Sequence, residues 1–344
     1  MAGLKAVALG GGHGLYATLT ALRLITQDVT AVVTVADDGG SSGRLRRELG
    51  VLPPGDLRMA LTALAGAEGH GARWRDLFQH RFGGTGALAG HAVGNLVLAG
   101  LLEVLGDPVA VLDEACRLLD VCGRVLPMAD EPLDIEADVA GLDGEPDTLR
   151  RIRGQVAVAT TPGRVHQVRL RPDRPRACVE AVRAVREADL VVLGPGSWFT
   201  SVLPHLLVPE LARALTETPA RRVLVLNLVP QPGETAGFSP EQHLLVLSDH
   251  APAGFTVHAV LADVDAVPVP ERLHRCAGDL GGHAYLHRVA DDGSADRHDP
   301  VALAAGLHLI LRPAGQGRSI DTAGALGDPD PGWDPQRKEE HGWR

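Results

Sequence analysis

The chain of 344 residues is poor in aromatic side chains and in positive charge. Aromatic residues make up 3% of it, and 33 lysines and arginines stand against 43 aspartates and glutamates, which gives a formal net charge of −10. Proteins that bind single-stranded nucleic acid stack bases on aromatic side chains, and DNA, RNA and anionic lipid surfaces repel a protein of this sign. Nucleic acid is therefore a poor first choice of partner.

Cysteines and long apolar runs are also scarce. Cys116, Cys122, Cys178 and Cys276 are scattered without CxxC spacing, so neither a disulfide framework nor a zinc knuckle is indicated. No apolar run approaches the roughly 18 to 20 residues that span a bilayer. The opening MAGLKAVALGGG leaves no room for a secretory signal. We therefore expect a cytoplasmic protein without a membrane span.

The fold class follows from a repeated pattern of short apolar run, glycine-rich turn and helical periodicity. Hydrophobic residues make up 45% and charged residues 22%, as in globular proteins. Strands are expected at 5–9, 29–36, 190–193, 223–228 and 257–261, and a helix follows the first strand at 15–25. Such alternation predicts an α/β fold with a mostly parallel sheet covered by helices on both faces.

The pattern also predicts how the chain is divided. Residues 56–122 have mainly helical periodicity and are expected to form a helical insertion. Ser239, Pro240 and Gln242 match the start of a capped helix. The segment 313–344 is rich in glycine, proline and charge without apolar periodicity, which predicts a disordered tail after one domain covering 1–312.

A first candidate binding loop lies between the first expected strand and its helix. Glycines there let backbone approach a ligand, and the amides of a helix start attract anions, so Gly11, Gly12, His13 and Gly14 are candidates for a phosphate or nucleotide cradle. The string is not a dinucleotide fingerprint, because Leu15 stands where the third glycine belongs, and it is not a P-loop. An ordinary tight turn is the alternative.

A second candidate loop follows the next strand. Asp37 and Asp38 stand where an acidic residue meets ribose hydroxyls in nucleotide folds, or where two carboxylates could hold Mg²⁺. The glycine and serine run after them predicts a second anion cradle from Gly40, Ser41, Ser42 and Arg44. The alternative is a polar turn in which an aspartate caps the next helix.

A third candidate loop, with Gly194, Gly196 and Ser197, follows the apolar run 190–193, and it lacks the G-x-S-x-G pattern of hydrolases. His91 and Asn95 lie four apart on one helix face, where pairing in the core is about as plausible as contact with a ligand. Loops that follow parallel strands meet at the carboxyl edge of a sheet, so we expect the three to converge on one crevice.

Together these strings resemble the YvcK/CofD-like family, and within it the branch of gluconeogenesis factors. The strings that carry the resemblance are GGGHGL (10–15), TVADDGGSSGR (34–44), PPGDLR (53–58), GHAVGNL (90–96), GPGSWFTSVL (194–203), QPGET (231–235) and RHDP (297–300). They span the chain in order up to about residue 312. His13 departs from the small hydroxyl residue usual in the family, and near Cys276 a tyrosine usual in the family has no counterpart.

The resemblance implies a Rossmann-like CofD fold and a regulator that binds UDP-sugars such as UDP-N-acetylglucosamine. In this branch such binding is tied to cell shape and to peptidoglycan precursor supply on gluconeogenic carbon sources, which implies an enzyme of amino-sugar or cell-wall precursor synthesis as partner. Arg297 is carried over as a ligand residue. The related branch, 2-phospho-L-lactate transferases acting on a deazaflavin (coenzyme F420 precursor) with Mg²⁺, is the alternative, and a nicotinamide-dependent oxidoreductase ranks below it. A homodimer is plausible.

Overall fold

The body of the protein is a seven-stranded parallel sheet. The computed structural model describes residues 3–144 and 148–312, so the expected tail at 313–344 lies outside the described residues. Along the sheet the strands are β3 (Arg124–Pro127), β2 (Asp28–Val33), β1 (Lys5–Gly10), β7 (Leu190–Leu193), β8 (Arg221–Val225), β9 (Ala259–Asp263) and β10 (His283–His287). The α/β, Rossmann-like prediction is confirmed.

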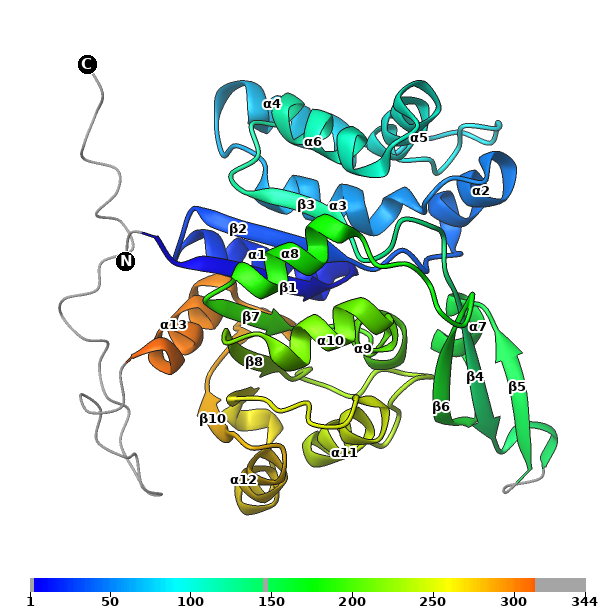
Figure 1. Ribbon diagram of the computed structural model, residues 1–344. Helices are drawn as coiled ribbons and strands as arrows, with labels where there is room; N and C mark the ends of the chain where they lie inside the picture. Colours follow the sequence, from blue (N-terminus) through cyan, green and yellow to red (C-terminus); the bar gives the residue numbers. More distant parts are fainter. Residues whose placement is uncertain (1–2, 145–147, 313–344) are drawn as a thin grey trace.

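Helices cover both faces of this sheet, which makes the body three layers thick (Figure 1). On one face lie α1 (Gly12–Arg23), α3 (Pro54–Leu64) and α13 (Pro300–Leu311). The other face carries α8 (Val179–Glu187) with α10 (Pro209–Glu217) beside it, and α12 (Pro270–Asp279) with α11 (Pro240–His250) lies by the β10 edge. The strands β7 and β9 are buried along their whole length, as expected of a sheet covered on both sides.

Five of the described helices lie between β2 and β3 in the chain. The first, α2 (Gly40–Leu49), is followed by α3, and then α4 (Gly69–Gln79), α5 (Val93–Leu105) and α6 (Pro108–Leu118) pack outside α3. Figure 1 shows α4, α5 and α6 as the outermost layer at the top of the view. The capped helix start at Ser239 is also present, with the reciprocal bonds of a capping box at the start of α11.

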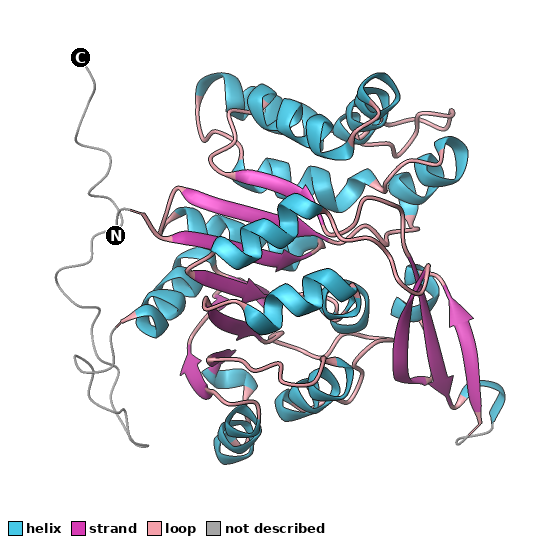
Figure 2. Cartoon of the chain, viewed as in Figure 1, coloured by secondary structure: helices cyan, strands magenta, loops and turns pink. Residues whose placement is uncertain are grey.

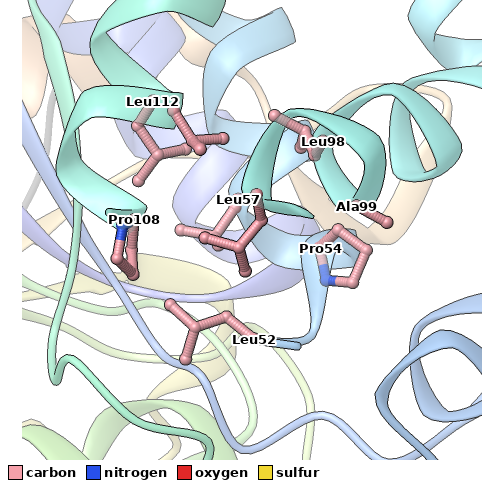
Figure 3. A pocket seen from close by; sticks show the side chains of 9 residues that line it. Leu52, Pro54, Leu57, Leu98, Ala99, Pro108 and Leu112 are labelled. Carbon is pink, nitrogen blue, oxygen red and sulfur yellow. The ribbon is translucent and has the colours of Figure 1, made fainter. Parts of the chain in front are cut away.

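A small apolar cavity of about 20 Å³ lies among these helices (Figure 3). Side chains from α3, α5 and α6 line it, among them Leu57, Leu98 and Leu112, together with Leu52 from the preceding loop. An apolar void of this size stays dry and has no polar group to orient a ligand. It is a gap in the packing of these helices, and no residue of the three candidate glycine loops lines it.

A second, three-stranded antiparallel sheet projects from the body (Figure 2). Its order is β5 (Leu149–Arg153), β4 (Asp134–Ala140) and β6 (Arg164–Arg171), and α7 (Gln155–Ala159) connects two of its strands. A hairpin of β11 (Ala290–Asp291) and β12 (Ser294–His298) precedes α13. Sequence reasoning missed this sheet, although DIEADVA in β4 alternates acidic and apolar residues as half-buried strands do.

The element boundaries differ from the expected ones by a few residues. The strand expected at 29–36 ends at Val33, because Val33 pairs with Gly10 of β1 and with Pro127 of β3, where both neighbouring strands also end. Residues 34–36 continue as buried loop. The first helix begins at Gly12 rather than at 15, which puts the glycine string inside its first turn.

The strand order identifies the place where a ligand would bind. From β1 the chain runs to β2 and β3 on one side, and it returns to β7 on the other side. The order therefore reverses between β1 and β7, and in open α/β sheets the crevice outside the carboxyl ends at such a switch point is the ligand site. Among the described residues, no helix is long and apolar enough to cross a membrane.

The cavity among α3, α5 and α6 gives a stability prediction. Leu112 is 1% exposed and already borders the void, so Leu112→Ala enlarges a cavity that its neighbours do not fill. We expect a loss of about 2–5 kcal/mol in the free energy of unfolding, measured by urea denaturation. The control is Val104→Ala on α5, whose valine is 81% exposed, and it should change stability by less than about 0.5 kcal/mol. Equal losses in the two variants would contradict this account of the packing.

Candidate functional site

The turn between β1 and α1 has no room for side chains. A Cβ atom on Gly11 would lie 2.4 Å from Asp56 Oδ2 and 2.6 Å from Thr34 Cγ2. Gly12 has φ +58°, a conformation that glycine adopts without strain. The Gly12 N–H donates to the carboxyl group of Asp56. The first amide of α1 is therefore already bonded to an oxygen of the protein itself, in the carboxyl group of Asp56.

The loop after β7 lies directly against this turn. A Cβ on Gly14 would lie 2.2 Å from the carbonyl oxygen of Pro195, and a Cβ on Gly196 would lie 3.7 Å from the carbonyl oxygen of Gly11. The hydroxyl of Thr18 in α1 donates to the Gly194 carbonyl at 2.9 Å. Candidate residues more than 180 positions apart in the sequence therefore form one backbone-lined crevice at the switch point.

Asn227, in the loop after β8, holds Gly196 in place. Its Oδ1 accepts from the Gly196 N–H at 2.9 Å, and its Nδ2 donates to the Gly196 carbonyl at 2.9 Å. The backbone N–H of Gly196 is therefore already bonded, and a ligand phosphate would have to compete with Asn227 for this donor. Ser197 begins the π-helical turn η2 (Trp198–Val202), where its carbonyl accepts from the amides of Ser201 and Val202.

Two carboxyl groups face the first glycine turn from the α2–α3 side. Asp56 is partly buried, and the loss of solvent around its carboxyl raises its pKa to about 7, with the nearby charge of Asp37 raising it further and Arg58 lowering it. Burial likewise raises the pKa of Asp37, against the lowering effect of bonds from the Gly39 N–H and the Ser42 hydroxyl. Within the described residues, the buried hydroxyl of Thr34 has no hydrogen-bond partner. This corner is the polar wall of the crevice.

Asp38 has different partners from Asp37. Its Oδ1 accepts from the Val156 N–H at 2.9 Å, at the start of α7, and a Cβ on Gly154 would lie 2.5 Å from its Oδ2. This carboxylate bonds to the first turn of α7, which is distant in sequence, whereas the capping alternative named the next helix, α2, whose N-cap residue is Gly39. In the part of the chain that the structure describes, no group of three or more His, Cys, Asp or Glu is arranged to hold a metal ion.

Ser41 and Asn95 belong to a buried network that joins helices. Asn95 Nδ2 donates to Ser41 Oγ at 2.9 Å, and Arg58 Nε donates to Asn95 Oδ1 at 2.9 Å. Ser41 Oγ also lies 2.9 Å from His91 Nδ1, and burial, with Arg44 nearby, lowers the pKa of that histidine. The network ties α2 to α5 and α3, which is the core-pairing alternative for His91 and Asn95. It also holds Arg58 beside Asp56.

The remaining predicted residues lie around the crevice rather than in it. Gly40 starts α2 with φ +47° and is exposed. His13 is exposed on the first turn of α1. Arg44 donates to the Ala89 carbonyl at 2.8 Å and so holds the loop before α5. Arg297 is exposed on β12, beyond the carboxyl ends of β8 and β9.

Glu234, in the loop 231–235, is a buried acid that sequence reasoning did not single out. It accepts from the Phe199 N–H at 3.0 Å and from the Thr200 hydroxyl at 2.5 Å, so it satisfies donors of the π-helical turn η2. Burial raises its pKa despite these bonds. Its loop also lies against α7, because a Cβ on Gly233 would be 2.1 Å from the Ala159 carbonyl oxygen. The loop thereby connects the crevice to the second sheet.

Sequence reasoning also missed Asp56, Thr34 and Asn227. Asp56 and Thr34 were visible as members of the strings PPGDLR and TVADDGGSSGR, but a rigid turn and a strand end explained them equally well. Nothing near Asn227 in the sequence marks it. Its role depends on the loops after β7 and β8 lying side by side.

The raised pKa of Asp56 predicts a pH dependence of stability. Its pKa rises from an ordinary 3.8 to about 7 in the folded protein, so unfolding releases a proton between these values. Stability should therefore fall as pH rises from about 4 to about 7 and level off above, by at most about 4 kcal/mol. Asp56→Asn keeps an oxygen for the Gly12 N–H and removes this slope. Urea denaturation of both proteins across this range tests it, and parallel stability curves would contradict it.

The contact between α1 and the loop after β7 gives a second prediction. Gly14→Ala places a methyl group on the Pro195 carbonyl and should cost about 1–3 kcal/mol, because backbone must move. The matched control is Gly100→Ala, also in a helix, whose Cβ position is open and where alanine should gain up to about 1 kcal/mol. Thermal unfolding measures both. A gain in stability for Gly14→Ala would show that the two loops do not touch.

Comparison with known proteins agrees with this geometry. The family described as "2-phospho-L-lactate transferase CofD" matches residues 6–296. A crystal structure of a protein member of the UPF0052 family from Bacillus halodurans is similar, with a TM-score of 0.79 and 33% identity, covering 91% of this chain and 100% of that one.

Relatives with assigned names are similar over most of the chain. A Mycobacterium tuberculosis protein named "Putative gluconeogenesis factor" is 64% identical over 304 residues, 88% of either chain. The Bacillus subtilis "Gluconeogenesis factor" is 39% identical over 264 residues, 77% of this chain and 80% of its own length. With the switch-point crevice and the family match covering the same residues, the chain belongs to the CofD family, among relatives named gluconeogenesis factors.

Proposed function

We propose that the protein is a cytoplasmic regulator that binds a UDP-sugar, of the UDP-N-acetylglucosamine type, in the crevice between β1 and β7. The observation that carries the proposal is the contact between the two glycine loops at the switch point, from Gly14 to Pro195 and from Gly196 to Gly11. Backbone without side chains, at a helix start, is the surface to which diphosphates bind.

The electrostatics of the crevice support a local rather than a global attraction for the diphosphate. The chain carries −10, so its overall field repels an anion. The Gly12 amide is bonded to Asp56. Because the pKa of Asp56 is raised to about 7, its carboxyl group is partly protonated, and therefore partly neutral, near neutral pH. A protonated Asp56 presents no charge to an entering phosphate. Arg58, bonded to Asn95, is a fixed cation close enough to Asp56 to lower its pKa.

The regulatory role rests on the relatives and on the resemblance of the motifs. Relatives with similarity over most of the chain are named gluconeogenesis factors, which points to control of metabolism on gluconeogenic carbon sources. We extend this to cell shape and peptidoglycan precursor supply, with an enzyme of amino-sugar or cell-wall precursor synthesis as the controlled partner.

A transferase of the 2-phospho-L-lactate type is the second candidate. The neighbouring carboxyls of Asp37 and Asp56 favour it, because the charge of Asp37 lies close enough to Asp56 to raise its pKa. Two carboxylates beside ligand phosphates suit Mg²⁺, which prefers few protein ligands and keeps phosphate and water oxygens. The metal would neutralise the phosphate charge, and these two aspartates, rather than Asp38 with its bond to α7, would hold it.

Titration calorimetry of the full chain distinguishes the UDP-sugar-binding regulator from the transferase. We expect saturable binding of UDP-N-acetylglucosamine, with UDP, NAD and a deazaflavin compared in parallel, each with and without Mg²⁺.

Arg297→Ala should weaken UDP-sugar binding at least about tenfold, which corresponds to about 1.4 kcal/mol. The matched control is Arg117→Ala on α6, whose guanidinium bonds to Glu114 and is exposed. Asp37→Asn should also reduce affinity while the protein stays folded, because Asp37 belongs to the polar wall of the crevice, and unchanged affinity would remove Asp37 from the site.

The possible outcomes of the titration distinguish the candidate functions. Binding of the deazaflavin alone, and only with Mg²⁺, would favour the transferase and overturn the regulator. Binding of NAD alone would overturn both. Equal effects of Arg297→Ala and Arg117→Ala would place the ligand away from β12.

A further inference from the structure

The second sheet concentrates arginine in a chain that is otherwise strongly acidic. Residues 148–176 contain eight arginines and one acid, Asp173, which gives this segment a net charge of +7. Because the whole chain has a net charge of −10, the rest of it carries −17. These arginines lie on β5, on β6 and in the loop that follows β6. The charge asymmetry is local and belongs to the part of the structure that projects from the Rossmann-like body (Figures 1 and 2).

One face of this sheet packs into the core, and the other is a layer of ion pairs. Ile135, Ala137 and Val139 of β4 are buried against the body. On the opposite face, β4 presents acids at every second position, and each accepts from arginines of neighbouring elements. These pairs are Asp138 with Arg151 (2.9 Å) and Arg169 (2.6 Å), Asp134 with Arg46 (2.5 Å) and Arg153 (2.5 Å), and Glu136 with Arg171 (2.9 Å).

In this layer the arginines lie above the acids. The Arg151 side chain is 52% exposed while Asp138 is 16% exposed, and Arg153 is 61% exposed while Asp134 is 25% exposed. The four guanidinium groups of β5 and β6 therefore cover the three carboxylates, whereas the Arg46 side chain is 16% exposed and lies deeper. The surface that solvent meets is positive. The acids fix the guanidinium groups in place, and these arginines lower the pKa of Asp134 and of Asp138.

The arginine face continues into a hollow beside α2. This hollow has a volume of about 380 Å³ and is lined by Arg46, Arg47, Arg153, Asp38, Asp134, Gly43 and Gly154. Arg47 is exposed and donates to the backbone carbonyl of Asp38 at 3.3 Å. Three guanidinium groups thus converge on a concave surface at one end of the face.

Strand β5 forms the outer edge of the sheet. It pairs with β4 on one side, and it is an edge strand in the sheet order of the described residues. All its residues are exposed except Ile152, which is partly so. Charged residues on an edge strand often prevent unwanted pairing, but charge of either sign serves that purpose. An excess of one sign, opposite to that of the whole chain, is not explained by edge protection.

We propose that this arginine face and the edge of β5 form a docking surface for an extended acidic segment of a partner protein. The segment would pair with β5 through backbone hydrogen bonds, and its carboxylates would meet Arg151 and Arg153. Its end would lie towards the hollow formed by Arg46 and Arg47. A nucleic acid fits less well, because the face contains three acids and a net charge of −17 surrounds it. The inference does not depend on which ligand occupies the switch-point crevice.

The test uses the full chain and a fluorescein-labelled peptide of alternating glutamate and valine, followed by fluorescence anisotropy. The variant is Arg151→Gln/Arg153→Gln, and the matched control is Arg117→Gln/Arg272→Gln, whose arginines are similarly exposed and each paired with one acid. We expect saturable binding, weakened at least about tenfold by the first double variant and less than about twofold by the second. An alternating lysine and valine peptide should not bind.

Three results would overturn the proposal. They are no binding of the acidic peptide, equal weakening by the two double variants, and tighter binding of a single-stranded DNA oligonucleotide with the same dependence on Arg151 and Arg153. The last would make the face a nucleic-acid surface. If Arg151→Gln/Arg153→Gln lowers the melting temperature, Arg47→Gln replaces it, because Arg47 bonds to a backbone carbonyl and leaves the acids of β4 paired. Unchanged peptide affinity in Arg47→Gln would then count against the hollow and the proposal.

Discussion

The contact between the first turn of α1 and the loop after β7 is the constraint on which the candidate site depends. Gly14 lies against the Pro195 carbonyl with no space for a side chain, and Gly11 leaves none between itself and Asp56. Such contacts require glycine, and they require β1 and β7 to be neighbours in the sheet. The reversal of strand order places β7 beside β1. The fold therefore brings the two loops together, and their glycines leave the backbone exposed at the crevice.

Buried polar groups around the crevice then hold the loops in position. Asp56 bonds to the first amide of α1, Asn227 bonds to both backbone groups of Gly196, and Glu234 bonds to donors of η2. Asp56 comes from the connection between β2 and β3, whereas Asn227 and Glu234 come from the loop between β8 and α11. Buried polar groups without partners are costly, so these contacts specify one arrangement of the loops. The crevice is therefore preformed, and its polar wall, Asp37 and Asp56, carries carboxyls with raised pKa.

The same loops connect the crevice to the second sheet. Asp38, next to Asp37, caps α7, and the loop of Glu234 lies against the carbonyl of Ala159 at the end of α7. The arginine face of β5, β4 and β6 is thus separated from the crevice by one short helix. A protein that senses a ligand in the crevice and contacts a partner through the second sheet would need this kind of connection.

The sequence by itself determined the fold class and most of the strings that build the crevice. Apolar runs followed by glycine turns predict parallel β-α units from local properties, and the strings with Gly11, Asp37 and Gly194 were visible for the same reason. Other features depended on the tertiary structure. Asp56 as a partner of Gly12, Asn227 as a partner of Gly196, and the separate roles of Asp37 and Asp38 involve residues far apart in the chain, brought together by crossovers of the sheet. Local periodicity carries no information about such pairs, because the strand order decides which loops become neighbours.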